Sequence, residues 1–193
     1  MTNALVALAA YLLGSVPFGL VMARLFGLGD IRQIGSGNIG ATNVLRTGSK
    51  PAAALTLLLD AGKGAIAVLA ARQIFGEGAA GVAALFVMLG HLFPVFLKFA
   101  GGKGVATFLG TLLALSFPVG VAACSSWLLT AVLSRYSSLS ALVAAALSPL
   151  FMLYFYHWHG AILVLLLALL IFLKHRPNIR RLLDRTEPKI GES

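Results

Sequence analysis

Polar residues gather in three clusters along a chain that is otherwise apolar. The first cluster combines glycines with two hydroxyls, two amides and one arginine: Ser36, Gly37, Asn38, Gly40, Thr42, Asn43 and Arg46. Glycines allow backbone N–H groups to converge on an anion, and a guanidinium can hold a phosphate through two parallel hydrogen bonds. A helix cap alone would need only one of the hydroxyls, Ser36 or Thr42. The cluster therefore predicts a loop that binds phosphate.

The same loop contains G-x-G-x-x-G, the pattern of a dinucleotide-binding turn, between Gly35 and Gly40. Asp60 follows Gly40 by twenty residues, as an acidic ribose ligand would. That site requires a βαβ unit, whereas the next segment here is apolar and long enough to span a membrane. We therefore exclude a dinucleotide site and predict no cofactor.

The second cluster is a short glycine-rich turn made of Gly101, Gly102, Lys103 and Gly104, followed by an apolar segment that begins at Val105. It is not a Walker A loop, because the upstream glycine is missing. The glycines expose the backbone, the next helix offers unpaired N–H groups, and Lys103 adds a full charge. These features favour a second phosphate contact. A tight interfacial turn with an outward-reaching lysine is the alternative.

The third cluster is a basic tail over residues 174–183 that also carries His175 and Asn178. Pro177 indicates that a helix begins close to this point. Anchoring on anionic lipid explains the lysines and arginines of such a tail. It does not explain the histidine and the amide, which stand three residues apart and can share a helix face.

Two opposite charges, Asp60 and Lys63, lie three residues apart inside an apolar segment and therefore on one side of a helix. Isolated charges in hydrocarbon are costly, so we expect them to pair or to face a polar cavity. For this pair, a structural role and a substrate-binding role both remain open. His91 is interpreted as a buried residue that hydrogen-bonds between helices.

Composition places these clusters in a membrane protein, because 59% of the 193 residues are hydrophobic and only 11% are charged. A soluble domain carries about 25% charged residues. Seven apolar segments qualify as helical spans, and they cover residues 4–23, 52–72, 79–98, 104–118, 120–134, 138–156 and 160–173. The first is expected to be retained, since it lacks the basic start of a signal peptide. We predict one all-α polytopic membrane domain over residues 1–193.

Basic residues fix the predicted orientation, because seven spans place nearly all of them on one side and only Arg72 opposite. By the positive-inside rule, the N-terminus is outside, the C-terminus is cytoplasmic, and the three clusters face the cytoplasm. The net charge of +9 is therefore a topology signal, with anionic lipids as additional partners, and does not predict nucleic-acid binding. If residues around Pro118 form one irregular segment, the count is six, which would put basic loops on both faces.

The sequence contains no arrangement of ligands for a metal and no pair of carboxylates for acid–base chemistry. Cys124 is the single cysteine, and no histidine has an aspartate five residues further on, which excludes the H-x-x-x-x-D class of acyltransferase. What remains is a cytoplasmic site of hydroxyls, amides and cations for phosphorylated, lipid-soluble substrates.

At these clusters the chain resembles the bacterial acyl-phosphate:glycerol-3-phosphate acyltransferases, small polytopic membrane enzymes, over nearly its whole length. The matching motifs are Ser36 to Arg46 preceded by Asp30-Ile31-Arg32, Gly90-His91 through Pro94-Val95-Phe96 to Gly101–Thr107, and His175-Arg176, Asn178-Ile179, Arg181-Leu182-Leu183 and Glu187. Asp60 to Gly64, Arg135-Tyr136 and Ser138-Leu139 also match. Ala100 and Arg185 depart from the pattern, which puts the tail geometry and the number of phosphate-binding cations in question.

The resemblance implies transfer of an acyl chain from acyl phosphate to the 1-hydroxyl of glycerol 3-phosphate, giving lysophosphatidic acid and phosphate for phospholipid synthesis. It places the reaction at Ser36, Asn38, Arg46, His175 and Asn178. It assigns substrate binding to Gly37, Gly40, Thr42, Asn43, Lys63, Gly101, Gly102, Lys103, Gly104 and Ser138. Asp60, His91 and Glu187 are expected to be structural. The resemblance alone selects acyl phosphate as donor, and it leaves the general base open.

Two rival functions use the same residues. A transporter for anionic solutes would need polar groups that continue to the outer face, yet residues 120–173 are nearly featureless apart from Ser138 and Ser140. A non-catalytic lipid-binding scaffold would tolerate loss of Arg46. The sequence indicates no oligomeric state.

Overall fold

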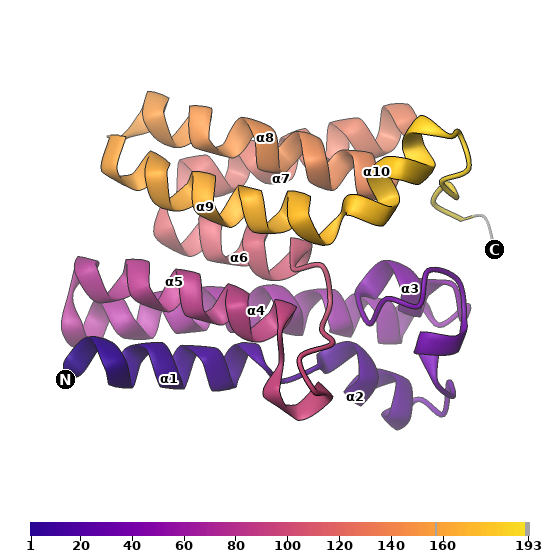
Figure 1. Ribbon diagram of the computed structural model, residues 1–193, viewed down its shortest axis with the longest axis horizontal. Helices are drawn as coiled ribbons and strands as arrows, with labels where there is room; N and C mark the ends of the chain where they lie inside the picture. The colour runs from indigo at the N-terminus through magenta and orange to yellow at the C-terminus, as the bar shows by residue number, and fades with distance from the viewer. Residues whose placement is uncertain (157, 192–193) are drawn as a thin grey trace.

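The computed structural model describes residues 1–156 and 158–191, and all the regular structure in them is helical (Figure 1). The α-helices are α1 (Thr2–Gly14), α2 (Phe18–Leu25), α3 (Ala41–Leu45), α4 (Lys50–Phe75), α5 (Glu77–Leu92), α6 (Val105–Leu115), α7 (Phe117–Ser134), α8 (Ser137–Phe155), α9 (Trp158–Lys174) and α10 (Arg176–Leu183). Short 3₁₀ turns lie between α2 and α3, at Ile31–Gln33, and between α5 and α6, at Val95–Leu97. The predicted all-α membrane fold is confirmed.

All seven predicted apolar segments are helical, but they differ in length. By length and composition, 5 helices of the described chain can cross a membrane, or up to 6 if α9 and α10, bent by 63°, form one span. The first of these is broken between α1 and α2, and α6 is shorter than a span. The seven-span topology and its orientation therefore remain predictions.

The turn at Ser116 separates α6 from α7, so residues 104–134 form two helices. Ser116 is extended, with φ −156° and ψ 106°, and α7 folds back along α6. A Cβ on Gly120 would overlap the backbone of Leu113, which shows how closely the two helices approach. The alternative of one irregular segment around Pro118 is not what the structure contains.

Arg72 completes the end of the short helix α6. The 11 residues of α6 are about 16 Å long, roughly half of a hydrocarbon core, so the carbonyls at its end need partners inside the protein. The Arg72 guanidinium, from α4, donates to Ala114 O and to Leu115 O, at 3.0 Å for the latter. It also pairs with Glu77 at 2.7 Å. The basic residue that topology places opposite the others thus has a local structural role.

Close backbone contact joins α4 to α6. A Cβ on Gly110 would overlap Ala61 O, and a Cβ on Gly64 would approach Thr107 O to within 2.5 Å. The largest apolar cluster packs around this pair from α5, α6, α8 and α9, and it includes Met88, Leu92, Phe108, Leu112, Leu167 and Ile171. The small residues therefore let α6 lie deep in the bundle. The second polar cluster directly precedes the start of α6.

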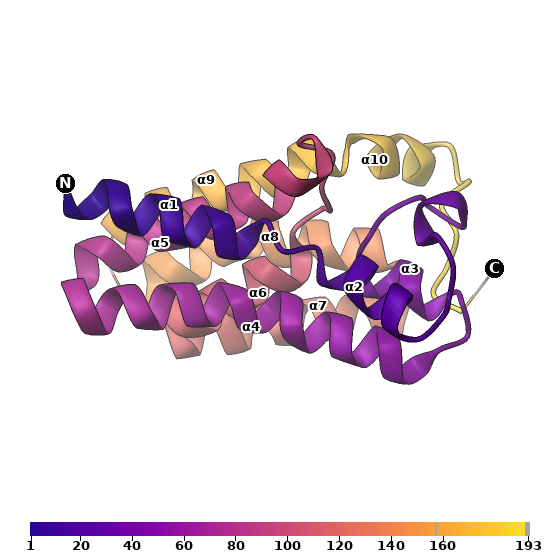
Figure 2. The same cartoon turned by 90° about the horizontal axis from the view of Figure 1, so that it is seen from below.

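The polar segments meet at one end of the bundle. In both views α2, α3 and α10 lie at the same end, and the N-terminus lies at the other (Figures 1 and 2). α6 lies between a layer formed by α1, α4 and α5 and a layer formed by α7, α8 and α9 (Figure 1). The fold thus brings the first and third polar clusters together, although more than a hundred residues separate them.

Candidate active site

One cavity of about 600 Å³ takes its polar lining from all three clusters. Of the residues predicted to react or to bind substrate, it is lined by Ser36, Asn38, Gly40, Thr42, Asn43, Arg46, Lys103, Gly104, Ser138, His175 and Asn178. The three residues predicted to be structural, Asp60, His91 and Glu187, line it as well. Gly37, Lys63, Gly101 and Gly102 do not belong to the lining.

Below its polar end the cavity continues as an apolar furrow between α4, α6 and α7. Its walls are formed by small and apolar side chains: Ala54, Leu57, Ala61, Leu109, Leu113, Cys124 and Trp127. Leu57 is 50% exposed on the outer surface of α4, which a membrane would cover with lipid. Only α6, the short helix, forms the floor between the other two.

Three cations line the polar end without an ion pair. Arg46, Lys50 and Lys103 make no salt bridge or side-chain hydrogen bond in the part of the chain that the structure describes. The carboxylates near them are already occupied, since Glu187 pairs with Arg181 at 2.7 Å and Asp60 pairs with Lys63 at 2.7 Å. The cavity therefore holds positive charge that an anion can neutralise.

The surroundings of Lys103 disfavour its charged form. Burial, more than any other cause, lowers its pKa to about 8, while Glu187 raises it, and Arg181 and Arg46 lower it further. Lys103 lines the cavity together with Arg46 and Glu187. A bound phosphate would favour the charged form of the lysine.

Asn43 organises the first loop from inside. It is buried, its Nδ2 donates to Ile31 O at 2.7 Å, and its Oδ1 accepts from the Ser36 backbone N–H at 3.2 Å. Gly35 turns beside it with a φ of 52°, and a Cβ there would approach Asn43 and Arg46 to within 2.8 Å. Both ends of the amide are thus engaged, so Asn43 shapes the loop that presents Ser36.

Glu187 holds the third cluster in place. Its Oε1 accepts from Asn178 Nδ2 at 2.6 Å, and its Oε2 accepts from Arg181 Nε at 2.7 Å. Burial would raise the pKa of this carboxyl, but hydrogen bonds from Asn178 and Arg181 and the charge of Arg181 help to hold it below its usual value. Asn178 Oδ1 has no partner among the described residues and remains able to accept a hydrogen bond.

His175 stands at the bend between α9 and α10 and is 2% exposed. Its Nδ1 lies 2.8 Å from Ile171 O. A carbonyl oxygen only accepts, so Nδ1 carries the proton, and in the neutral ring Nε2 is the basic nitrogen. The ring can therefore accept a proton or a hydrogen bond at Nε2.

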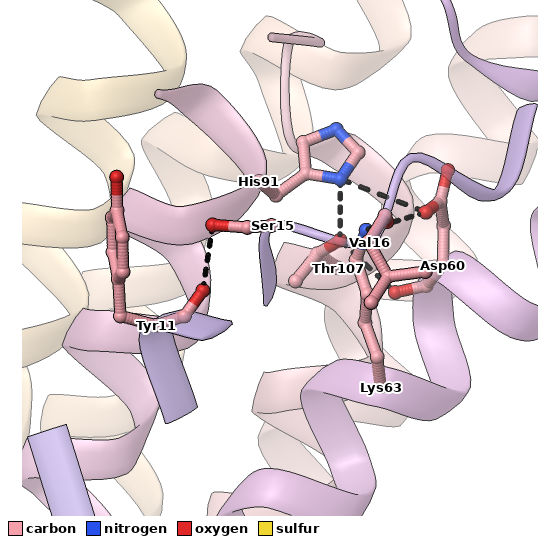
Figure 3. A network of polar contacts seen from close by, with 7 residues as sticks. All are labelled: Tyr11, Ser15, Val16, Asp60, Lys63, His91 and Thr107. Atoms are coloured by element: carbon pink, nitrogen blue, oxygen red, sulfur yellow. Dashed lines mark hydrogen bonds and ion pairs between the residues drawn. The ribbon is translucent and has the colours of Figure 1, made fainter. Parts of the chain in front are cut away.

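Lys63 lies behind the cavity in a network of polar groups (Figure 3). Its ammonium donates to Asp60 Oδ1 at 2.7 Å and to Val16 O at 2.9 Å, and its side chain is 1% exposed. Of the two roles left open by the sequence, this placement favours the structural one. Lys63 ties α4 to the break between α1 and α2.

His91 completes the same network (Figure 3). Thr107 donates to Asp60 O at 3.0 Å and lies 3.2 Å from His91 Nδ1, which is 3.6 Å from Asp60 Oδ1. Gly102 packs on the other side of the ring, where a Cβ would collide with Nε2, and its N–H donates to His91 O at 3.2 Å. Gly101 and Gly102 therefore seat the second cluster on His91, and Lys103 and Gly104 line the cavity.

The cavity is also lined by four residues that are not among the predicted site residues: Lys50, Ser137, Trp127 and Lys189. Lys50 stands at the start of α4, directly after the cap Ser49, whose side chain accepts from Ala52 N. Lys50 follows Arg46 by four residues, and this closeness to a predicted phosphate ligand is a sequence signal for its role. Ser137 Oγ lies 3.2 Å from Thr42 Oγ1, a contact between segments far apart in sequence that no local pattern reveals.

Comparisons with known proteins agree on one family. The sequence profile described as "Glycerol-3-phosphate acyltransferase" matches residues 4–185. Similar curated proteins with that name come from Jannaschia sp. and Dinoroseobacter shibae. The first is 65% identical over 189 residues, covering 98% of this chain and 93% of that protein. The second is 63% identical over 188 residues, covering 97% and 93%.

Two solved structures resemble the fold. One is a crystal structure of PlsY, described as an integral membrane glycerol 3-phosphate acyltransferase in the glycerol 3-phosphate form. It has a TM-score of 0.93 and 39% identity and covers 99% of this chain and 96% of that chain. The lysophosphatidic acid form has a TM-score of 0.89 and 37% identity, with the same coverage.

Proposed function

The chain belongs to the glycerol-3-phosphate acyltransferase family of integral membrane enzymes, and we propose that its donor is acyl phosphate and its product lysophosphatidic acid. The observation that carries this proposal is the cavity itself. Three cations without an ion pair among the described residues meet several neutral donors at its polar end, and an apolar furrow leads away from them toward the lipid. Such a site suits one phosphorylated acceptor and one phosphorylated donor with a long chain.

The polar end supports the simultaneous binding of two phosphates. Together they bring about four negative charges, whose repulsion Arg46, Lys50 and Lys103 offset. Backbone N–H groups at the start of α6, beside Gly104, point the positive end of the helix dipole in the same direction. The similar protein solved in a glycerol 3-phosphate form supports this assignment for the acceptor.

The furrow between α4, α6 and α7 would take the acyl chain. Its apolar lining removes hydrocarbon from water, and its exposed side at Leu57 gives entry from the membrane. The acyl carbonyl would then lie at the junction of the furrow and the polar end. There Ser36 and Asn38, which line the cavity, would stabilise the oxyanion.

The reaction requires one bond to form and one to break at the acyl carbon. The 1-hydroxyl oxygen of glycerol 3-phosphate attacks, the bond from the acyl carbon to the phosphate oxygen breaks, and phosphate leaves with the electron pair. Phosphate is already a good leaving group, so positioning is the main task of the protein. Asn178 Oδ1, which is unpartnered, would orient the hydroxyl. Its proton passes either to His175 Nε2 or to phosphate, and these two bases remain open.

We also propose that residues 1–193 form one domain in the cell membrane with the polar end in the cytoplasm. The N-terminus and α10 lie at opposite ends of the bundle, as an odd number of crossings requires (Figure 1). Counting α6 as a short crossing gives seven. The basic residues near α10 favour the cytoplasmic side for that end.

An assay of the purified protein in detergent tests the donor. Glycerol 3-phosphate is supplied with palmitoyl phosphate or with palmitoyl-CoA, and phosphate and lysophosphatidic acid are measured separately. We expect turnover with palmitoyl phosphate, in equal amounts of both products, and a large loss in Asn178→Ala. Turnover with palmitoyl-CoA alone would refute the proposed donor while leaving the family intact.

A further inference from the structure

The C-terminal segment at residues 186–190, here called the strap, crosses the polar end of the cavity. Glu187, Pro188, Lys189 and Ile190 all contribute to its lining. The strap is held at two points. Glu187 binds Asn178 and Arg181 of α10, and Ile190 binds the turn between α7 and α8.

Arg135 forms the second attachment through two groups. Its carbonyl oxygen accepts from the Ile190 N–H at 2.7 Å, and its Nη2 donates to Ile190 O at 3.3 Å. Lys189 of the strap also contacts this turn, since its ammonium lies 5.9 Å from the centroid of the Tyr136 ring. Arg135 and Ile190 thus close a two-bond latch between segments 55 residues apart.

The left-handed backbone conformation of Arg135 indicates that its side chain has a function. It ends α7 in the left-handed region, with φ 63° and ψ 11°, while its N–H donates to Ala131 O. A glycine adopts that conformation without steric cost, whereas another L-residue pays for it. A side chain that is retained at a strained backbone position indicates a function. The hydrogen bond that the Arg135 side chain makes is the one to Ile190 O.

The strap reaches groups that the proposed reaction uses. Glu187 fixes the amide of Asn178, and its charge raises the pKa of Lys103, which shows that it lies near both. Releasing Ile190 from Arg135 would remove the two hydrogen bonds that hold the far end of the strap. The polar end of the cavity would then be open to water.

We propose that Arg135 is a positioning residue, which latches the strap over the two phosphates and keeps water from the acyl carbon. The proposal rests on acyl phosphate as donor. With the strap closed, the acceptor hydroxyl attacks the donor. With the strap open, water attacks the same carbon, the bond to the phosphate oxygen breaks, and the products are a fatty acid, phosphate and one proton.

The variant Arg135→Gly separates this role from a structural one. It keeps the carbonyl acceptor, relieves the left-handed backbone and removes only the side-chain donor. We expect an unchanged or higher Tm, about fivefold faster phosphate release from palmitoyl phosphate without acceptor, and a KM for glycerol 3-phosphate raised about fivefold. kcat for transfer should change less than twofold. Arg135→Lys, which keeps one donor, should recover most of the coupling.

Ile190→Pro removes the other half of the latch, because proline has no N–H to donate to Arg135 O. Its effect on hydrolysis should be similar to that of Arg135→Gly, and the double variant should add little to either, since both open the same latch. A lower Tm in Arg135→Gly with transfer and hydrolysis reduced together would overturn the proposal, because Arg135 would then support only the fold.

Amide hydrogen exchange of the strap tests the proposal without an acyl donor. We expect glycerol 3-phosphate to slow exchange in residues 186–191 of the parent protein at least fivefold, and to slow it little in Arg135→Gly. If the acceptor leaves exchange unchanged in the parent protein, the strap does not close on substrate and the proposal is wrong. If exchange behaves as expected but palmitoyl phosphate is not used, the latch stands and the donor assignment fails.

Discussion

Lys63 and Lys103 are both largely buried lysines, but their surroundings differ. Lys63 is buried and makes contacts of 2.7 Å with Asp60 and 2.9 Å with Val16 O. Lys103 lines the cavity with no ion pair among the described residues, and its pKa is lowered to about 8. A satisfied buried charge holds helices together, whereas an unsatisfied one remains available for a ligand. The predictions below test that division.

The largest effect on stability is expected when the buried ion pair of Asp60 and Lys63 is broken. Asp60→Ala leaves the Lys63 ammonium buried without its carboxylate, which typically costs about 3–5 kcal/mol. We expect a strong fall in the thermal unfolding temperature in detergent. The double variant Asp60→Asn with Lys63→Met should recover part of it, because no unpaired charge remains. If the single variant were as stable as the parent protein, the network would not hold the helices together.

Arg46→Ala should have the opposite effect, with a large loss of activity and little loss of stability. Arg46 makes no ion pair with any described residue, so the unfolding temperature should change little. Its loss removes a two-bond phosphate contact, and kcat/KM should fall about 100-fold. Arg46→Lys keeps the charge but not the fork and should recover only part of the activity. Equal losses of stability and activity would contradict a role in substrate binding.

The protonation of Lys103 predicts a pH dependence. With its pKa lowered to about 8, the lysine is charged below that pH and loses its charge as the pH rises through it. Because phosphate binding needs the charged form, the apparent affinity for glycerol 3-phosphate should fall about fivefold between pH 7 and pH 9. The substrate's own second ionisation is near pH 6 and is complete in this range. In Lys103→Arg the decline should disappear, and a persistent decline would assign it to another group.

The smallest effect is expected at the exposed pair of Asp30 and Arg32. Their side chains meet at 2.7 Å, and hydrogen bonds from Arg32 lower the pKa of Asp30 to about 2. Solvent screens such a pair, so short distance alone confers little stability. Asp30→Asn should leave both the unfolding temperature and kcat/KM within experimental error. A clear loss in either would show that ion-pair geometry matters here even without burial.

The sequence by itself determined which segments are helical and most of the polar residues that line the cavity. Apolar runs and their lengths are local properties, and so are the glycines, amides and cations of the three clusters. Eleven of the fifteen residues predicted to react or to bind substrate line one cavity. The motifs also identified the family correctly, because the spacing of those residues is specific.

The tertiary structure decided which polar groups are satisfied and which are free. The spacing of Asp60 and Lys63 left pairing and a polar cavity both open, and the fold buries them as a pair. Lys103 instead lines the cavity with no ion pair among the described residues. Arg72 at the end of α6 and Ile190 on Arg135 likewise depend on contacts between distant segments. Hydrogen bonds and burial are set by packing in three dimensions, and sequence periodicity carries no record of those partners.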